Sequence, residues 1–331
     1  MPDVKKILIV RFSSIGDIVL TSPIIRCLHL HYPKTELHFL TKKNYTPLIE
    51  NHPAIQRVYA ITHSIQEVWD DILHEEYDYI IDLHKNRHSR KLSAIRHAQY
   101  LSFHKRNIEK WLLVNTKINL LPNEHIVERY FHAVSSLGVT YDQCGLDFYF
   151  PRQTNFHIHN LPKVFQNGYG VIVLGAQHFT KQIPSSILSQ VIRIVDFPVL
   201  LIGDENDREK GEEICQHLPS LHIYNAAGLF DLPSSADIIQ QSQWVLTGDT
   251  GMMHIAAALK KKVISVWGST VPQFGMKPIF PNNSANFSFI IENKDVHCRP
   301  CSKLGFPRCP NKHFYCMNTI SPQQIADAIC K

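Results

Sequence analysis

The decisive stretch of this chain is residues 247–270, TGDTGMMHIAAALKKKVISVWGST. The apolar residues 244–246 directly before it predict a buried strand, which the polar turn 248–251 ends. A helix is expected over 252–259 and a second strand over 263–267. The stretch is therefore a strand–turn–helix–strand unit, the building block of a parallel α/β sheet.

The turn of this unit has the features of an anion-binding site. Its two glycines let the backbone approach a ligand closely, and the start of the following helix presents unpaired N–H groups and a positive dipole end. Asp249 and His254 place a hydrogen-bond acceptor and a donor beside it. We expect such a site to bind a diphosphate attached to a group rich in hydroxyls.

Length and composition fit a globular protein of two domains. The chain has 331 residues, of which 44% are hydrophobic and 19% are charged. It contains no apolar run long enough to span a bilayer or to form a secretory signal, so we expect a cytoplasmic protein. In that compartment eight cysteines do not imply disulfides.

Strand and helix patterns alternate along the chain in two sets, which an irregular stretch at 150–168 separates. Strands are expected at 6–10, 36–40, 55–61, 79–83, 99–103, 169–174, 199–202, 221–224, 244–246 and 263–267. Among the helices between them, the clearest are expected at 18–31 and 124–137, the second ending at Gly138. Such alternation is typical of parallel sheets with right-handed crossovers.

The two sets predict two Rossmann-like domains that face each other across a cleft, with ligands at the carboxyl ends of the strands. We expect an N-terminal acceptor-binding domain at 1–155 and a C-terminal nucleotide-sugar-binding domain at 156–320. The last residues, 321–331, are expected to form a helix that packs back on the N-terminal domain.

A second strand–turn–helix unit begins the chain, and its turn, 13–17 (SSIGD), lacks the G-x-G-x-x-G spacing of a dinucleotide site. Asp17 lies in the first turn of the expected helix. It is either an acid that stabilises the helix start or a general base that takes a proton from an acceptor hydroxyl. Ser13 and Gly16 are predicted to contact the sugar donor.

Two loops of the second domain are further candidates. Thr180 and Lys181 precede a helix start, and a lysine there either clamps a diphosphate or lies at the surface as most lysines do. Glu205 follows the strand at 199–202, where acids bind ribose hydroxyls or cap the next helix.

Basic residues are concentrated at 83–110, where Glu109 is the only acid. The net charge of the whole chain is +5. The segment is either a solvated helix face or a surface for an anionic partner, such as nucleic acid, a membrane or a phosphorylated acceptor.

Three blocks together resemble glycosyltransferase family 9, the lipopolysaccharide heptosyltransferases. They are IVRFSSIGDIVLTSPII (9–25), LGAQHFTKQIP (174–184) and TGDTGMMHIAAALKKKVISVWGSTVP (247–272), and NEHIVERYFHAVSSLGV (123–139) also looks like that family. The resemblance implies a GT-B fold and inverting transfer of heptose from ADP-heptose to the lipid A–core acceptor of lipopolysaccharide. It implies neither cofactor nor obligatory metal, and a place in the cytoplasm or peripherally on the cytoplasmic face of the inner membrane.

The resemblance also implies roles for single residues. Asp17 matches the catalytic base, Lys181 the lysine on the donor phosphates and Asp249 the acid that contacts the sugar hydroxyls. The phosphate-binding turn contains Thr250, Gly251 and His254. Glu205 lies near the family's ribose-binding acid.

The acceptor would then meet the basic segment. We expect Lys85, Arg87 and Arg90, which follow a strand of the first domain, to contact phosphates or carboxylates of the acceptor core.

Four cysteines near the end have the spacing C-x2-C-x7-C-x6-C; they are Cys298, Cys301, Cys309 and Cys316. Four thiolates within twenty residues fit a structural zinc site, although the second C-x-x-C of a zinc ribbon is missing. The alternatives are packed or redox-sensitive thiols. The stretch 298–317 also resembles heptosyltransferase II-type members, which implies no metal.

Other readings of the sequence compete with heptose transfer. The chain could use another nucleotide sugar or acceptor, or be a non-catalytic relative that binds a nucleotide sugar or nucleic acid. An oxidoreductase conflicts with the missing G-x-G-x-x-G motif, and a nucleic-acid binder conflicts with the lack of dense aromatic interleaving in the basic segment.

Overall fold

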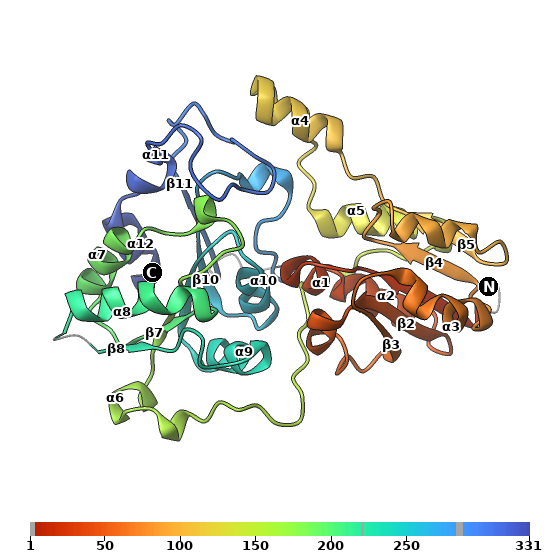
Figure 1. Cartoon of the computed structure of the whole chain (residues 1–331), viewed down its shortest axis with the longest axis horizontal. Coiled ribbons are helices and arrows are strands. Elements are labelled where there is room, and N and C mark those ends of the chain that lie inside the picture. The colour runs from red at the N-terminus through yellow and green to blue at the C-terminus, as the bar shows by residue number, and fades with distance from the viewer. Residues whose placement is uncertain (1–3, 220–221, 283–286) are drawn as a thin grey trace. The chain divides into compact units, whose positions relative to one another are not determined.

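The computed structural model of the chain describes residues 4–219, 222–282 and 287–331 (Figure 1). It divides into two compact units. The N-terminal unit comprises Met1–Lys105 and Glu124–Pro151, and the C-terminal unit comprises Arg106–Asn123 and Arg152–Lys331. The segment Arg106–Asn123, which the sequence places in the first domain, therefore packs with the second unit.

A parallel sheet of five strands, in the order β3-β2-β1-β4-β5, forms the N-terminal unit. The strands are β1 (Lys6–Val10), β2 (Glu36–Lys42), β3 (Ile55–Ile61), β4 (Tyr79–Asp82) and β5 (Gln99–Ser102). Its helices are α1 (Ile15–Val19), α2 (Ser22–His31), α3 (Trp69–His74) and α5 (Ile126–Ala133). β1 is the middle strand, and its apolar residues 7–10 are fully buried. All five predicted strands are confirmed, with ends that move by two residues or fewer.

The predicted helix at 18–31 is wrong in its start and its continuity. α1 begins at Ile15 and ends at Val19, and α2 begins at Ser22. Pro23 is the cause, because it lacks the N–H that would continue the helical hydrogen bonds and suits the first turn of a new helix. Asp17 therefore lies in a short helix of its own, directly after the first strand.

The helix expected at 124–137 is also shorter than predicted. α5 covers Ile126–Ala133, and a separate 3-10 turn follows at Ser135–Leu137. Gly138 ends this segment with a φ of +72°, so the predicted glycine stop is confirmed.

The C-terminal unit contains a parallel sheet of six strands in the order β11-β10-β9-β6-β7-β8. The strands are β6 (Gly170–Val173), β7 (Val199–Ile202), β8 (Ile223–Asn225), β9 (Trp244–Gly248), β10 (Lys262–Trp267) and β11 (Ser288–Glu292). Its helices are α4 (Asn107–Thr116), α6 (Lys163–Gln166), α7 (Ser185–Val195), α8 (Arg208–His217), α9 (Leu232–Gln241), α10 (Gly251–Ala258), α11 (Tyr315–Asn318) and α12 (Pro322–Cys330). Five of the strands are those predicted, although the predicted start of β8, Leu221, lies outside the described residues. β11 is an edge strand that the sequence analysis did not predict.

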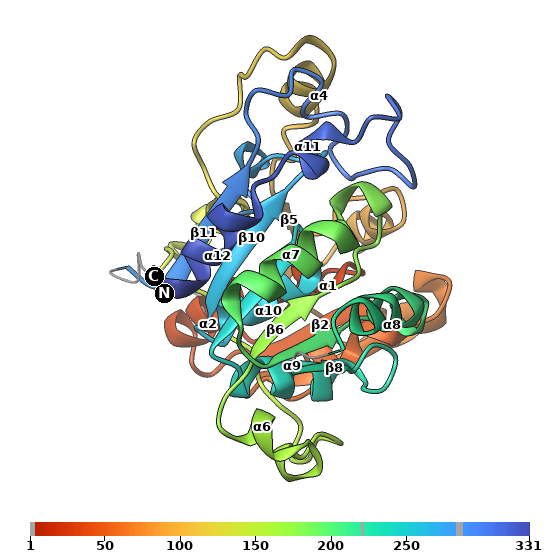
Figure 2. The same cartoon turned by 90° about the vertical axis from the view of Figure 1, so that its left-hand side faces the viewer.

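Two apolar layers cover the two faces of this sheet. Because side chains alternate along a strand, Ile172 packs with α7 and α12 while its neighbour Val171 packs with α9 and α10. The sequence predicts that the C-terminal helix packs on the N-terminal domain, but the buried face of α12 lies in the core of the C-terminal unit, against α7 (Figure 2). Within the described ranges, no helix is long and apolar enough to cross a membrane.

Candidate active site

The turn after β9 has the predicted form of a strand end that leads directly into a helix. β9 ends at Gly248, and α10 begins at Gly251 with Thr250 as its N-cap. The Thr250 hydroxyl accepts a hydrogen bond from the Met253 amide at 3.4 Å and lies 2.9 Å from the Thr247 hydroxyl. This cap leaves the amides at the very start of α10 directed beyond the end of the strand, where an anion is favoured.

Gly248 explains how a second loop reaches this turn. A Cβ atom at this position would lie 2.1 Å from the carbonyl oxygen of Lys181, a distance that real side chains do not tolerate. The glycine therefore lets the loop after β6 pack directly against the end of β9. Since β6 and β9 are neighbours in the sheet, the two loops meet at one edge.

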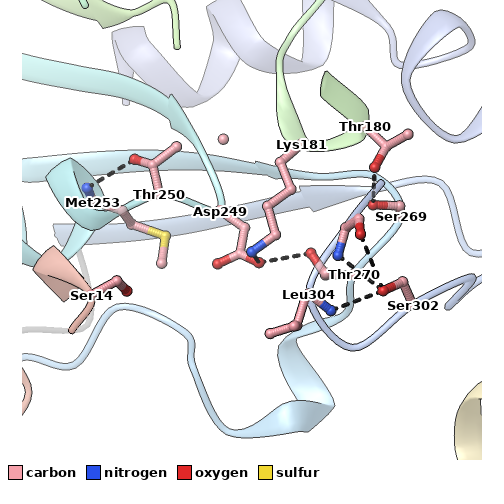
Figure 3. A network of polar contacts seen from close by, with 12 residues as sticks. Ser14, Thr180, Lys181, Asp249, Thr250, Met253, Ser269, Thr270, Ser302 and Leu304 are labelled. Carbon is pink, nitrogen blue, oxygen red and sulfur yellow. Dashed lines mark hydrogen bonds and ion pairs between the residues drawn. The ribbon is translucent and has the colours of Figure 1, made fainter. Parts of the chain in front are cut away.

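Lys181, Asp249 and Thr270 form a polar network at this edge (Figure 3). The Lys181 ammonium lies 2.7 Å from one carboxylate oxygen of Asp249, and the Thr270 hydroxyl donates to that same oxygen at 2.8 Å. The three residues follow the ends of β6, β9 and β10, three adjacent strands. The side chains of Lys181 and Asp249 are 17% and 12% exposed, so both can still reach a ligand.

The network is suited to hold an anion. An ammonium group has three N–H donors, so Lys181 can keep its ion pair with Asp249 and still donate to a phosphate oxygen. Asp249 in turn fixes the position of a long, flexible side chain before any ligand binds. Such preorganised charge is the kind that stabilises a departing diphosphate.

Thr180, which the sequence analysis predicts to contact the donor, lies inside the C-terminal unit. Its side chain is buried, and its hydroxyl accepts hydrogen bonds from the Phe306 amide at 2.8 Å and the Ser269 hydroxyl at 2.9 Å. It therefore holds the loop of Lys181 in place from inside the unit. His254 is also buried, at 2% exposure, in the first half of α10.

Of the two predicted roles of the acids after β7, the structure shows helix capping. Asp204 and Asp207 cap the turn: the Asp204 side chain accepts from the Asn206 amide at 2.8 Å, and Asp207 accepts from the Asp204 amide at 3.0 Å. Glu205 lies between them with an exposed side chain, and its Cα packs against Gly228 of the next loop. Asp204 and Asp207 therefore cap the turn, and the Glu205 side chain faces solvent.

Lys210 on α8 is a residue that the sequence analysis missed. Its ammonium donates to the carbonyls of Leu174 at 3.0 Å and Ile183 at 2.9 Å, which flank the loop that carries Lys181. Burial lowers the pKa of Lys210 to about 8, despite the opposing charge of Asp207. Lys210 therefore holds together the two ends of the loop that carries Lys181. No sequence motif predicted this role.

In the N-terminal unit Asp17 is held by two partners. One carboxylate oxygen lies 2.6 Å from the Arg11 guanidinium, and the other accepts from the Ser14 hydroxyl at 2.9 Å and the Ser14 amide at 3.2 Å. Burial would raise the pKa of Asp17, but the charge of Arg11 and the bonds from Ser14 hold it below its usual value. Asp17 is therefore ionised at neutral pH, the form that a general base requires, although its basicity is reduced.

Arg11 and His84 are further neighbours of Asp17 that the sequence analysis missed. Arg11 is buried and also donates to the carbonyls of Ser13, at 2.8 Å, and of Leu83. Burial, together with the charges of Arg11 and Lys105, lowers the pKa of His84 to about 3, so this imidazole is neutral. A signal for Arg11 existed, because a charge directly after four buried strand residues needs a partner. Gly16 is buried within α1.

The basic residues after β4 do not all point outward. The Lys85 ammonium donates to the Phe103 carbonyl at 2.7 Å, and its amide donates to the buried Asp82 carboxylate. Arg87 and Arg90 have exposed side chains. Of the three predicted acceptor contacts, the two arginines are thus the ones presented to solvent.

The four clustered cysteines are all free thiols. In the described part of the chain, no group of three or more histidine, cysteine or acidic side chains is arranged to hold a metal ion. Burial raises the pKa of Cys316 to about 11, which keeps this thiol protonated. The zinc alternative therefore has no support from the geometry, and Cys309 and Cys316 pack against the core of the C-terminal unit.

Comparison with known proteins agrees with this geometry. The profile of glycosyltransferase family 9 (heptosyltransferase) matches residues 65–304. Lipopolysaccharide heptosyltransferase 1 of Campylobacter coli is 22% identical over 97% of this chain and 96% of its own length. Lipopolysaccharide heptosyltransferase 3 of Escherichia coli K12 is 25% identical over 77% of this chain and 80% of its own length.

Solved structures show the same architecture. A family 9 glycosyl transferase of Veillonella parvula superimposes with a TM-score of 0.78, covering 98% of this chain and 96% of its own, at 19% identity. The E. coli ADP-heptose lps heptosyltransferase II gives 0.71, covering 98% and 97%, at 18% identity. The predicted GT-B fold with two parallel-sheet domains is confirmed. With a family match across most of its length, the chain belongs to glycosyltransferase family 9 and is a glycosyltransferase.

Proposed function

We propose that this enzyme transfers a heptose from ADP-heptose to the lipid A–core oligosaccharide of lipopolysaccharide, with inversion at the anomeric carbon. The observation that carries the proposal is the network of Lys181, Asp249 and Thr270 at the start of α10, which suits a sugar diphosphate. The relatives that match most of the chain are named for lipopolysaccharide heptose transfer, which favours this donor and acceptor.

Each group then has a role in a single displacement. The acceptor oxygen forms a bond to the anomeric carbon, the bond from that carbon to the diphosphate breaks, and ADP leaves. Asp17 accepts the acceptor proton. Lys181 and the amides of Thr250 and Gly251 stabilise the charge that grows on the departing diphosphate. Asp249 binds the sugar hydroxyls, and Glu205 the ribose.

Acceptor recognition falls to the N-terminal unit in this proposal. Arg87 and Arg90 are exposed beyond the end of β4, where they can meet phosphates or carboxylates of the core. Since the acceptor is anchored in a bilayer, the enzyme works peripherally at the cytoplasmic face of the inner membrane. Because Lys181 and backbone amides carry the leaving-group charge, we expect turnover to persist when divalent metals are chelated.

A donor screen tests the proposal. The purified enzyme is incubated with ADP-heptose, other ADP-sugars, UDP-sugars and GDP-sugars, each with truncated lipid A–core acceptors, and products are read by mass spectrometry. We expect an acceptor heavier by one heptose with ADP-heptose alone, with or without EDTA. A product formed only from a different nucleotide sugar would replace the donor assignment. Failure with every donor, beside an active heptosyltransferase as control, would contradict the proposal.

A further inference from the structure

We propose that Arg299 is a positioning residue for the sugar-donor site. It holds the segment 267–270 in the conformation that presents the Thr270 hydroxyl to Asp249. The proposal rests on the donor-site role given above to Lys181 and Asp249. It also gives a function to the cysteine-rich segment, which heptose transfer by itself does not explain.

The Arg299 side chain lies almost fully inside the C-terminal unit, at 5% exposure. Its guanidinium donates to four backbone carbonyls: Gly268 at 2.5 Å, Asn293 at 2.6 Å, Trp267 at 3.0 Å and Thr270 at 3.2 Å. It also forms an ion pair of 2.9 Å with the Glu292 carboxylate, which is 9% exposed. A buried charge with this many acceptors is fully compensated.

These contacts join the carboxyl ends of two neighbouring strands. Trp267 is the last residue of β10 and Glu292 the last of β11, and the two are paired in the sheet. The same guanidinium also contacts residues 268 and 270, which lie beyond β10. Arg299 therefore defines the path of the chain as it leaves the strand.

That path determines where Thr270 lies. Thr270 is 1% exposed, and its hydroxyl donates to the carboxylate oxygen of Asp249 that also pairs with Lys181 (Figure 3). If the segment shifts, Asp249 loses one of these two donors and can rotate away from Lys181. A chain of contacts thus connects Arg299 to the predicted phosphate lysine, through Thr270 and Asp249.

The same segment supports the Lys181 loop from a second side. The Cys301 amide donates to the Ser269 carbonyl at 3.0 Å, and the Ser269 hydroxyl donates to Thr180 at 2.9 Å. The Phe306 amide donates to the Thr180 hydroxyl at 2.8 Å. Gly268 is closely surrounded as well, because a Cβ there would lie 3.0 Å from the Thr180 carbonyl oxygen.

Arginine is required for this role by its shape. Its planar guanidinium has five N–H donors in a fixed fork, whereas lysine has three donors around a single atom. The four carbonyls and the carboxylate are shared among all three guanidinium nitrogens, an arrangement that the single nitrogen of an ammonium cannot serve. We therefore expect Arg299→Lys to fail although it keeps the charge.

The test compares variants of the full chain in donor KM, acceptor KM and kcat. Arg299→Met alone would leave the buried Glu292 with the exposed Lys294, 4.0 Å away, as its ion-pair partner, so both residues are replaced together as Glu292→Met/Arg299→Met, which avoids a poorly compensated buried carboxylate. We expect this double variant, Arg299→Lys and Thr270→Val to raise the donor KM about tenfold or more, because each loses or misplaces a hydrogen bond to a charged group. The acceptor KM should change less than about twofold.

Two controls separate positioning from general destabilisation. Thr270→Ser keeps the hydroxyl and should restore the donor KM to near the wild-type value. Arg308→Met removes an exposed arginine of the same segment and should change nothing. A donor KM within about twofold of wild type in both Thr270→Val and the double variant overturns the proposal, as does a wild-type value in Arg299→Lys.

Two further readouts do not depend on which sugar is transferred. ADP binding by calorimetry and amide hydrogen exchange at 180–181 and 267–270 should both change in the double variant and not in Arg308→Met. If the wild-type enzyme transfers no heptose but these changes occur, the proposed function fails and the positioning role stands. If heptose transfer occurs and these readouts do not change, the positioning role fails alone.

Discussion

Each unit contains an aspartate just after a buried strand, at the start of a helix, and each aspartate pairs with a cation. Asp17 lies 2.6 Å from Arg11, and Asp249 lies 2.7 Å from Lys181. The partners differ in origin. Arg11 is six positions from Asp17 and directly follows the strand that leads to the same turn. The partners of Asp249 come from other loops: Lys181 follows β6, and Thr270 follows β10.

This difference separates two kinds of carboxylate. The position and charge of Asp17 are determined by residues close in sequence, because Arg11 is always charged and keeps the carboxylate ionised and in place. Asp249 is set by tertiary contacts, and its partner is a lysine with donors left for a ligand. The first arrangement suits a group that acts on a proton, and the second suits a group that binds. The predictions that follow test this distinction.

The largest effect is expected for Asp17→Asn. An amide cannot accept the acceptor proton, so kcat should fall about 10³-fold, while ADP affinity stays within about twofold of wild type. Kinetics and calorimetry measure the two quantities. Asp71→Asn, an exposed acid on α3, serves as the control. Near-normal turnover in Asp17→Asn would refute its assignment as the base.

Lys181→Met should affect both binding and turnover. It removes the ammonium that neutralises the diphosphate, so we expect kcat to fall about 10²-fold and ADP affinity to fall as well. Asp17→Asn should show only the first of these changes. Lys163→Met, at an exposed lysine on α6, should behave as wild type. If Lys181→Met leaves ADP affinity unchanged, the proposed distinction between a proton-accepting site at Asp17 and a ligand-binding site at Lys181 and Asp249 is wrong.

Arg87→Ala/Arg90→Ala should change the acceptor side only. Loss of two exposed cations is expected to raise the acceptor KM about tenfold and to leave the donor KM unchanged, because charge-assisted contacts to phosphates are lost. Steady-state kinetics at varied acceptor concentration measures this, with Lys34→Ala as an exposed control. An unchanged acceptor KM would show that these arginines are solvated surface residues that do not bind the acceptor.

The smallest effect concerns stability and pH. The pKa of Asp17 is lower in the folded protein than its usual value of 3.8, so its ionised form stabilises the fold above that pH. The difference in free energy of unfolding between wild type and Asp17→Asn should be constant from pH 5 to 7 and should shrink as pH falls below about 3.8. Urea unfolding at several pH values measures it. A difference that grows on acidification would contradict the ion pair with Arg11.

Much of the fold was predictable because the spacing of apolar residues along the chain indicates which side chains are buried. The apolar residues 7–10 of β1 and those of β9 are buried on both faces of their sheets, which gives a strong local signal. β11 lacks that signal, since it is an edge strand with one exposed isoleucine, Ile290. The break between α1 and α2 was missed because Pro23 was read as part of a continuous helical pattern.

The candidate site was predictable in part for the same reason. Asp17, Lys181 and Asp249 follow strand ends in recognisable motifs, and Thr270 lies within the quoted stretch. The contacts of Thr180 were not predictable, because no local pattern reveals that its hydroxyl accepts from the Phe306 amide. Lys210 and Arg299 were missed because their partners are backbone carbonyls far away in sequence.

By itself the sequence determined the alternation of strands and helices, the glycine turn before α10 and the family, because these depend on short-range spacing and side-chain type. Only the tertiary structure decided that Lys181 and Thr270 contact the same carboxylate oxygen of Asp249. It also decided that Arg299 holds the segment 267–270, from which Thr270 reaches Asp249. The physical reason is that parallel strands bring loops separated by tens of residues to one edge of the sheet. Hydrogen bonds across that edge depend on distance in space, which local pattern does not encode.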